Sequence, residues 1–300
     1  LSSGIGFQPR VLIKDETGAT LSDFFAYGKN FLGGVTAVIG NVDEDSSLEV
    51  VTAPLSLGGP HIRVFHENGE LESQFMAYDP KYRGGYSVAI GDITGDGVGE
   101  IIVAPLRGGG PHVKVFSKTG SLLGEFFAYS EQFRGGVRVA SVDIDNDRLD
   151  DIVTAPATEG GPHVRIFDIG GHVKSQFMAF DATLRGGLTL TAGDVDSDGT
   201  PEIAVARLIP SDIQVRIFEP NGVEKNRFLL YGGLSGDEVP SELAMSDVTG
   251  DGQPEIMSYP LTLGAVVTAS DFFGRTVNVI DLAGANTADR AVRFSFDFNR

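Results

Sequence analysis

Five acidic segments of nine residues carry the residue types best suited to binding chemistry. They span residues 41–49, 92–100, 143–151, 194–202 and 247–255, and we number them loop one to loop five in that order. Positions one, three, five and nine of every loop have oxygen-bearing side chains: Asn41, Asp43, Asp45 and Glu49; Asp92, Thr94, Asp96 and Glu100; Asp143, Asp145, Asp147 and Asp151; Asp194, Asp196, Asp198 and Glu202; Asp247, Thr249, Asp251 and Glu255. Position seven would add a backbone carbonyl from Ser47, Val98, Leu149, Thr200 or Gln253.

This spacing suits a hard metal ion. Short side chains at alternate positions of a tight loop point toward one centre, and a carboxylate at position nine can close the shell. Six or seven oxygen ligands are what Ca²⁺ prefers. Without an ion, the carboxylates of each loop would repel one another. We therefore expect about five Ca²⁺ ions, the alternative being five solvated acidic turns.

The loops are expected to differ in affinity. Loops three and four each have four carboxylates and should bind calcium more tightly than loops two and five. We expect loop four to be the strongest and loop one the weakest. At position six, where glycine is preferred, Ser46 and Arg148 would have to accept a strained backbone angle, at about 1 kcal/mol.

The elements that must hold these loops repeat along the chain. The Gly-Gly pair at 33–34 recurs at 84–85, 135–136 and 186–187, a constant step of 51 residues. One unit contains four strand-like segments, at 86–90, 100–105, 112–116 and 122–129, and four short strands form one propeller blade. The repeated Phe-(Phe/Met)-Ala-(Tyr/Phe) run on the fourth strand should pack one blade on the next.

We therefore predict an all-β fold, a single β-propeller over residues 1–300. Six blades are expected, and a truncated seven-bladed propeller is the alternative. The repeats are placed at about 33–83, 84–134, 135–185, 186–236 and 237–285. Residues 1–32 and 286–300 would together complete one blade, since the chain opens on an outer strand pair that lacks inner strands.

A four-stranded meander places successive connections on opposite faces. The acidic loops and hairpin turns should share one face, and the Gly-Gly-Pro-His turns and Arg-Gly-Gly connections the other. A ring of Arg and His there could receive a carboxylate, a sulfated glycan or an acidic peptide. Its members are His61, Arg83, His112, Arg134, His163 and Arg185. The structural alternative is that Arg bridges blades and His bonds within its turn. Because Gln214 replaces the repeated histidine in the next unit, the ring would be incomplete. A single asymmetric binding site is therefore a further alternative.

Composition narrows the class of partner. Among 300 residues the net charge is −18, which disfavours nucleic acid and anionic membranes as partners. The absence of cysteine excludes disulfides and thiolate sites. The sequence has no run of eighteen or more apolar residues, so membrane insertion is not expected. It also does not open with a segment that resembles a secretory signal peptide. A first residue other than Met suggests a mature form or an excised piece.

The run from Gly84 to Pro105, Gly-Gly-Tyr-Ser-Val-Ala-Ile-Gly-Asp-Ile-Thr-Gly-Asp-Gly-Val-Gly-Glu-Ile-Ile-Val-Ala-Pro, closely resembles an FG-GAP (VCBS-type) repeat. Such repeats build the propellers of integrin α-subunits and of many bacterial surface proteins. The resemblance extends from about residue 9 to about 282. It weakens in unit five, and Arg-Gly-Gly replaces Phe-Gly at the start of each blade. It implies a calcium-stabilised propeller used for adhesion or macromolecular recognition.

These observations predict a binding or adhesion module at the cell surface or outside the cell. Its partner would be a protein or a glycan, and the chain would be a monomer or part of a larger chain. No catalytic motif is present, so an enzyme is not expected. The alternatives are a lectin, a polysaccharide lyase or glycosidase, and a structural spacer within a larger surface protein.

Overall fold

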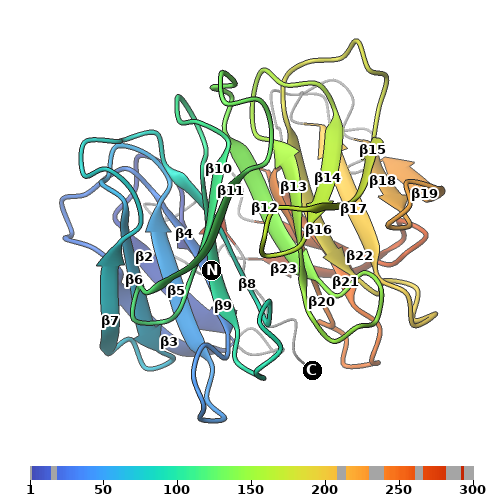
Figure 1. Ribbon diagram of the computed structural model, residues 1–300. Helices are drawn as coiled ribbons and strands as arrows, with labels where there is room; N and C mark the ends of the chain where they lie inside the picture. Colours follow the sequence, from blue (N-terminus) through green and yellow to red (C-terminus); the bar gives the residue numbers. More distant parts are fainter. Residues whose placement is uncertain are drawn as a thin grey trace.

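The computed structural model describes residues 2–14, 19–207, 214–229, 240–260, 266–281 and 292–293. This part of the chain forms strands and turns and contains no helix. The described strands form six four-stranded sheets. These sheets are arranged as the blades of a propeller (Figure 1). The prediction of an all-β propeller with six blades is therefore confirmed. No helix long and apolar enough to cross a membrane occurs in the described ranges.

Five blades follow the chain as simple antiparallel meanders, with the first strand of each innermost. The first two blades are β4 (Val35–Gly40), β5 (Glu49–Pro54), β6 (His61–His66) and β7 (Leu71–Met76), then β8 (Tyr86–Gly91), β9 (Glu100–Pro105), β10 (His112–Phe116) and β11 (Leu122–Phe127). The next two are β12 (Val137–Val142), β13 (Asp151–Pro156), β14 (His163–Phe167) and β15 (Val173–Met178), then β16 (Leu188–Gly193), β17 (Glu202–Arg207), β18 (Gln214–Phe218) and β19 (Glu224–Leu229). The fifth is β20 (Pro240–Ser246), β21 (Glu255–Pro260), β22 (Val266–Ser270) and β23 (Thr276–Asp281).

The sixth blade combines segments from both ends of the sequence. Its strand order is β24 (Val292–Arg293), β1 (Ser2–Ser3), β2 (Arg10–Lys14) and β3 (Thr20–Phe25). Strands β1 and β24 pair antiparallel, with Ser2 opposite Arg293 and Ser3 opposite Val292. The rest of the predicted closing segment 286–300 lies outside the described residues, and the repeat boundaries stay a prediction.

Burial follows strand position within a blade. The second strand is buried along its whole length in β5, β9 and β13, and along all but its last residue in β17, which explains the continuous apolar runs. The third strand alternates between buried and half-buried residues, and the outer strand is mostly exposed. Each blade thus has one central strand covered on both faces by its neighbours.

Aromatic side chains join neighbouring blades at four junctions among the described residues, as the repeated run predicts. Phe75 of β7 packs on Phe116 of the following blade with ring centroids 5.0 Å apart, and Phe126 packs on Phe167 at 4.7 Å. The spacing falls within the range that favours aromatic pairs. These contacts stack the blades radially and bury faces that a lone sheet would expose.

The Gly-Gly pairs mark close backbone approaches. A Cβ atom on Gly84 would lie 1.9 Å from the carbonyl oxygen of Arg107, and Gly85 has a φ of +84°. Only glycine fits both conditions without displacing the backbone. The connection between blades is therefore held tightly against the turn between the second and third strands of the next unit.

Candidate metal centres

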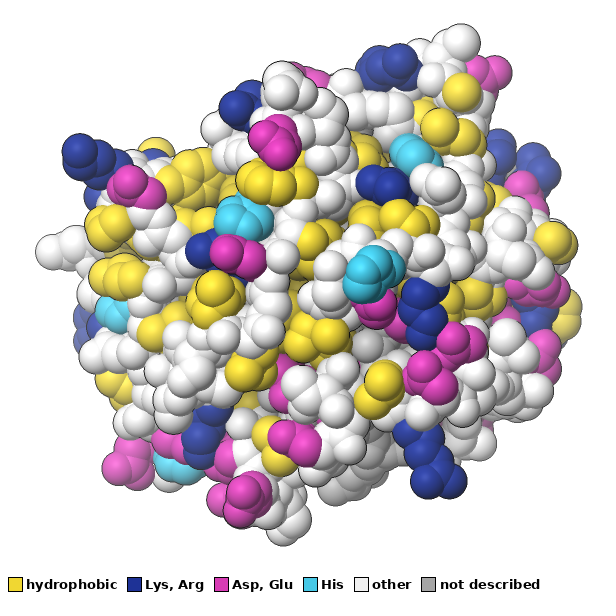
Figure 2. All heavy atoms as spheres, viewed as in Figure 1, with side chains coloured by type: hydrophobic (Ala, Val, Ile, Leu, Met, Phe, Trp, Pro, Cys, Tyr) yellow, Lys and Arg dark blue, Asp and Glu magenta, His cyan; other side chains and the backbone are white. Residues whose placement is uncertain are grey.

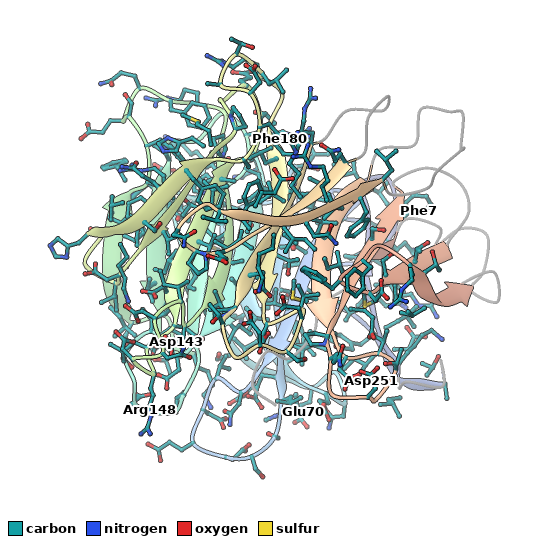
Figure 3. All side chains as sticks on the ribbon, turned by 90° about the vertical axis from the view of Figure 1, so that its right-hand side faces the viewer. Phe7, Glu70, Asp143, Arg148, Phe180 and Asp251 are labelled. Atoms are coloured by element: carbon teal, nitrogen blue, oxygen red, sulfur yellow. The ribbon has the colours of Figure 1, made fainter. Side chains whose placement is uncertain are left out.

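The five acidic loops join the first strand to the second strand in their blades. In Figure 3, Asp143 and Arg148 of loop three and Asp251 of loop five lie at the same end of the propeller as Glu70 of a hairpin turn. Phe7 and Phe180 lie at the opposite end. We call the end with the acidic loops the lower face. The other end, with the second-to-third strand turns and the connections between blades, is the upper face.

The position-nine carboxylate is buried in every loop and closes it. One oxygen accepts a hydrogen bond from the backbone N–H at position two, over 2.8 to 3.3 Å. Burial raises the pKa of each of these carboxyls, to about 6 for Asp151. A buried anion of this kind needs a cation or several donors beside it. The five residues are Glu49, Glu100, Asp151, Glu202 and Glu255.

Loops two to five share one backbone course. The position-one aspartate accepts hydrogen bonds from the N–H groups at positions five and six, as Asp92 does from Asp96 at 3.1 Å and from Gly97 at 2.9 Å. Position six then has a positive φ, which is +85° at Gly97 and +71° at Arg148. Arg148 therefore accepts the strained angle that the sequence predicts for it.

Loop one takes a different course, and the prediction for Ser46 is wrong. Its φ is not positive. Each side chain instead bonds the N–H two residues later: Asp43 N–H donates to Asn41 at 3.0 Å, and Asp45 N–H donates to Asp43 at 2.8 Å. Successive turns of this kind reverse the chain without a left-handed residue.

Four loops gather at least three carboxylates, with one oxygen from each lying within 4.8 Å of the others. Their members are Asp43, Asp45 and Glu49; Asp143, Asp145 and Asp151; Asp194, Asp196, Asp198 and Glu202; and Asp247, Asp251 and Glu255. Loop two, described in full, has no such group of three. Its Thr94 hydroxyl donates to Glu100 at 3.0 Å, as Thr249 does to Glu255 in loop five.

Lysine ammonium groups lie inside loops three and four. Lys225 Nζ lies 2.6 Å from Asp196, 2.7 Å from Asp198 and 2.8 Å from Glu202. Lys174 Nζ is 2.8 Å from Asp145 and 2.9 Å from Asp151. These lysines did not figure among the predicted site residues, because each lies 23 positions after the end of its loop. Their signal in the sequence is the shared register of the two positions, 51 residues apart.

A third lysine reaches loop one from the neighbouring blade. Lys118, in the turn between β10 and β11, lies 2.7 Å from Asp43 and also pairs with Glu72 on β7. Glu72 occupies the repeat position of Lys174 and Lys225. Loop one therefore also has a lysine paired with one of its carboxylates. Unlike Lys174 and Lys225, however, this lysine comes from the neighbouring blade and so links two blades.

The donors of loops two and five fit a calcium ion. Each loop offers three carboxylates and a threonine hydroxyl, all of them oxygen ligands. Among the described residues, no lysine pairs with either loop. In loops three and four, by contrast, the carboxylate oxygens at positions three, five and nine are already in contact with an ammonium group.

On the upper face the three repeated arginines are exposed and hold their own loops. Arg83 Nη1 donates to the carbonyl oxygens of Pro80 and Tyr82. Arg134 and Arg185 repeat this arrangement one and two units later. Each arginine thus bonds only to the connection between blades in which it lies and does not bridge neighbouring blades. These bonds stabilise the local conformation of that connection.

The three repeated histidines are half-buried beside outer-strand residues. Burial lowers the pKa of His61, His112 and His163, which favours the neutral ring. Each pairs in register with an exposed apolar residue at the upper end of the outer strand, and Gln214 continues the series. Those residues are Met76, Phe127, Met178 and Leu229. The first three are the second residue of the Phe-(Phe/Met)-Ala-(Tyr/Phe) run, so the prediction that this run packs between blades is wrong at that position, which is exposed. Figure 2 shows histidine beside apolar surface in the upper part of the view.

No family model matches this sequence. Among curated proteins it is similar to integrin α chains. It is 28% identical to integrin alpha-5 of Xenopus laevis over 210 residues, covering 60% of this chain and 20% of the relative. It is 29% identical to integrin alpha-PS2 of Drosophila melanogaster over 253 residues, covering 70% and 16%. The chain thus spans a fifth or less of the length of these relatives.

Solved structures share the fold at low identity. Raptor of Chaetomium thermophilum has a TM-score of 0.57 and 17% identity, with 91% of this chain and 23% of that chain covered. BBS1N, solved in complex with ARL6DN, has a TM-score of 0.55 and 11% identity, with 94% and 83% covered. An Agrocybe aegerita lectin that recognises terminal N-acetylglucosamine has a TM-score of 0.50 and 17% identity, with 93% and 77% covered. These likenesses show the propeller fold alone.

Proposed function

We propose that this chain is a calcium-stabilised propeller that works outside the cell as a binding module. Its partner, a protein or a glycan, would dock on the upper face. The similarity to integrin α chains supports a binding role and an extracellular or cell-surface location. The role proposed is recognition and not catalysis.

The exposed apolar side chains at the upper end of the outer strands carry this proposal. Met76, Phe127, Met178 and Leu229 are 46–60% exposed and repeat at the same register in four successive blades. Apolar groups beside polar and charged groups are typical of a recognition surface. The neighbouring arginines, each with guanidinium donors beyond those of Nη1, would favour an acidic partner.

Calcium is proposed as a structural ion on the lower face. The buried position-nine carboxylates of the loops that take calcium, such as Glu100 and Glu255, would be its central ligands. The ion would tie the first strand to the second. Calcium sites of extracellular modules bind with dissociation constants of about 10⁻⁴–10⁻³ M. Millimolar calcium outside the cell would therefore occupy from about half to about nine-tenths of such sites.

Thermal unfolding in EGTA and in a calcium titration tests the metal. We expect the melting temperature to rise with calcium and to respond little to an equal concentration of magnesium. An unchanged melting temperature at 5 mM calcium, together with no heat of calcium binding, would contradict the calcium proposal.

The binding face is tested with arrays of extracellular-matrix proteins and of glycans that include sulfated glycans and polyuronates. M178D should lose the array signal, since it places a charge in the apolar rim. L122D is the matched control, because Leu122 is similarly exposed at the lower end of an outer strand. Equal signal loss in both variants would contradict an upper-face site. Degradation of a polyuronate would instead indicate an enzyme.

A further inference from the structure

The residue at loop position three varies together with the presence of a lysine. Where this residue is aspartate, in loops one, three and four, a lysine ammonium pairs with it. Where it is threonine, in loops two and five, its hydroxyl donates to the position-nine glutamate. The five loops therefore fall into two kinds. In one kind a lysine ammonium pairs with the loop carboxylates, and in the other a threonine hydroxyl donates a hydrogen bond to the position-nine carboxylate.

In loop four the ammonium group sits where a metal ion would be bound. Lys225 Nζ contacts one oxygen from each of positions three, five and nine, at 2.6, 2.7 and 2.8 Å. Glu202 is fully buried and the lysine side chain is 16% exposed. Three oxygens that a calcium ion would need are therefore shared with a cation belonging to the chain itself.

Loop three repeats this arrangement. Lys174 Nζ lies 2.8 Å from Asp145, 3.5 Å from Asp147 and 2.9 Å from Asp151, again positions three, five and nine. Lys174 on β15 and Lys225 on β19 occupy the same repeat position. The second blade has Leu123 at this position, and Leu123 is exposed. The same outer-strand position thus supplies the lysine in both blades.

The ammonium and a calcium ion cannot share one loop. They have charges of the same sign and require the same oxygens, so calcium would have to displace the lysine and leave its charge beside the ion. Compared with loops two and five, loops three and four each have one additional aspartate, at position three, and one additional lysine, and the charges of these two residues cancel. A loop with four carboxylates and one lysine has the same formal charge as a loop with three carboxylates.

We propose that Lys174 and Lys225 are the resident cations of loops three and four, which are closed without metal, and that calcium binds loops two and five. The second part rests on the function proposed above. The order of affinity inferred from carboxylate number is thereby reversed: the two loops with the most carboxylates do not take calcium. Loop one is left out, since Lys118 contacts only Asp43 within that loop.

Calcium stoichiometry in matched position-five variants tests the assignment by loop. Isothermal titration calorimetry and equilibrium dialysis would count the ions bound to the unmodified protein, D251N and D198N. D251N should bind one ion fewer, and D198N should bind as many as the unmodified protein. A loss of one ion in D198N would overturn the inference while leaving the calcium proposal intact.

An exchange of residue pairs tests the lysine directly. D196T/K225L gives loop four the residues of Thr94 and Leu123 and keeps its charge, so the variant should fold. It should bind one additional calcium ion and gain a calcium-dependent rise in melting temperature. T94D/L123K, the reverse exchange in loop two, should bind one ion fewer. L123M is the control and should match the unmodified protein.

The outcomes separate the two proposals. If the unmodified protein binds no calcium but D196T/K225L does, the lysine assignment holds and calcium at loops two and five is excluded. If D196T/K225L gains no ion, the lysine does not determine whether its loop takes calcium, and the inference is overturned. An unchanged ion count in T94D/L123K, when D251N has lost one ion, would overturn it as well.

Discussion

Tyr129 Oη lies 2.8 Å from the carbonyl oxygen of His163 in the next blade, and donates its proton there. It follows Phe126 in the repeated aromatic run, so the same run supplies both an apolar contact and a polar contact between blades. Tyr27 and Tyr78 make the same bond to His61 and His112, at 2.7 Å in both cases. This position is a phenylalanine, Phe180, in the fourth unit.

Y129F should lower the free energy of unfolding by about 1 kcal/mol, because a buried carbonyl loses its donor. Urea denaturation would measure the loss, and Y27F should show a similar one. The slope of the unfolding free energy against urea concentration should stay constant, since the rest of the contact between the two blades is kept. A loss below 0.3 kcal/mol in both variants, on the order of experimental error, would show that these bonds add little to stability.

R148G should stabilise the protein by about 1 kcal/mol, because glycine adopts the positive φ of Arg148 without steric strain. S46G is the matched variant at the same loop position. Ser46 is not strained, so glycine there should give no gain and should lower stability slightly through the entropy of the unfolded chain. Denaturation of both variants at one calcium concentration would check this. Equal gains would mean that loop one shares the course of loop three.

Two glycines with nearly equal φ separate backbone strain from crowding. Gly120 (+86°) would place a Cβ atom 2.5 Å from the Phe75 side chain, whereas Gly97 (+85°) has open space. G97A should lower stability by about 1 kcal/mol, and G120A by about 1–3 kcal/mol more. The difference between their unfolding free energies measures the blade contact. If the two losses are the same, Phe75 can move aside freely.

His163 should make stability depend on acidity between pH 7.5 and pH 5. Burial lowers its pKa below 6.5, with the charge of Arg165 acting in the same direction. The contribution of the neutral His163 ring to the free energy of unfolding is therefore complete above pH 6.5, and it is lost as the pH falls from there through the pKa of the folded state. The stability advantage of the unmodified protein over H163Q should shrink at pH 5. Because the acidic loops are unchanged in H163Q, their own titration cancels in this difference. An advantage that grows on acidification would refute the prediction.

The blade architecture could be predicted because it depends on a repeated pattern. Gly84 and its equivalents keep a fixed step, and continuous apolar runs such as Glu100–Pro105 predict a strand buried on both sides. The positions of Phe75 and Phe126 likewise indicate contacts between blades. Such signals recur in several units, so local exceptions do not hide them.

The contents of the loops could not be predicted in the same way. Lys225 lies far from Glu202 in the sequence, and only the pairing of the three strands β17, β18 and β19 brings its ammonium to that carboxylate. Counting carboxylates therefore overestimated the charge left for a metal. Ser46 escaped prediction because side chain-to-backbone bonds offered loop one another course, which the choice of residue at position six alone does not reveal.

The pairing of Ser2 with Arg293 determines how the ring would respond to mechanical force. In this antiparallel pair, the beginning of β1 and the end of β24 lie at the same end. A load pulling the two apart would peel β1 from β24 one bond at a time, whereas a shearing load would strain all the bonds together. Tension applied across this junction would therefore open the propeller at the blade that closes it.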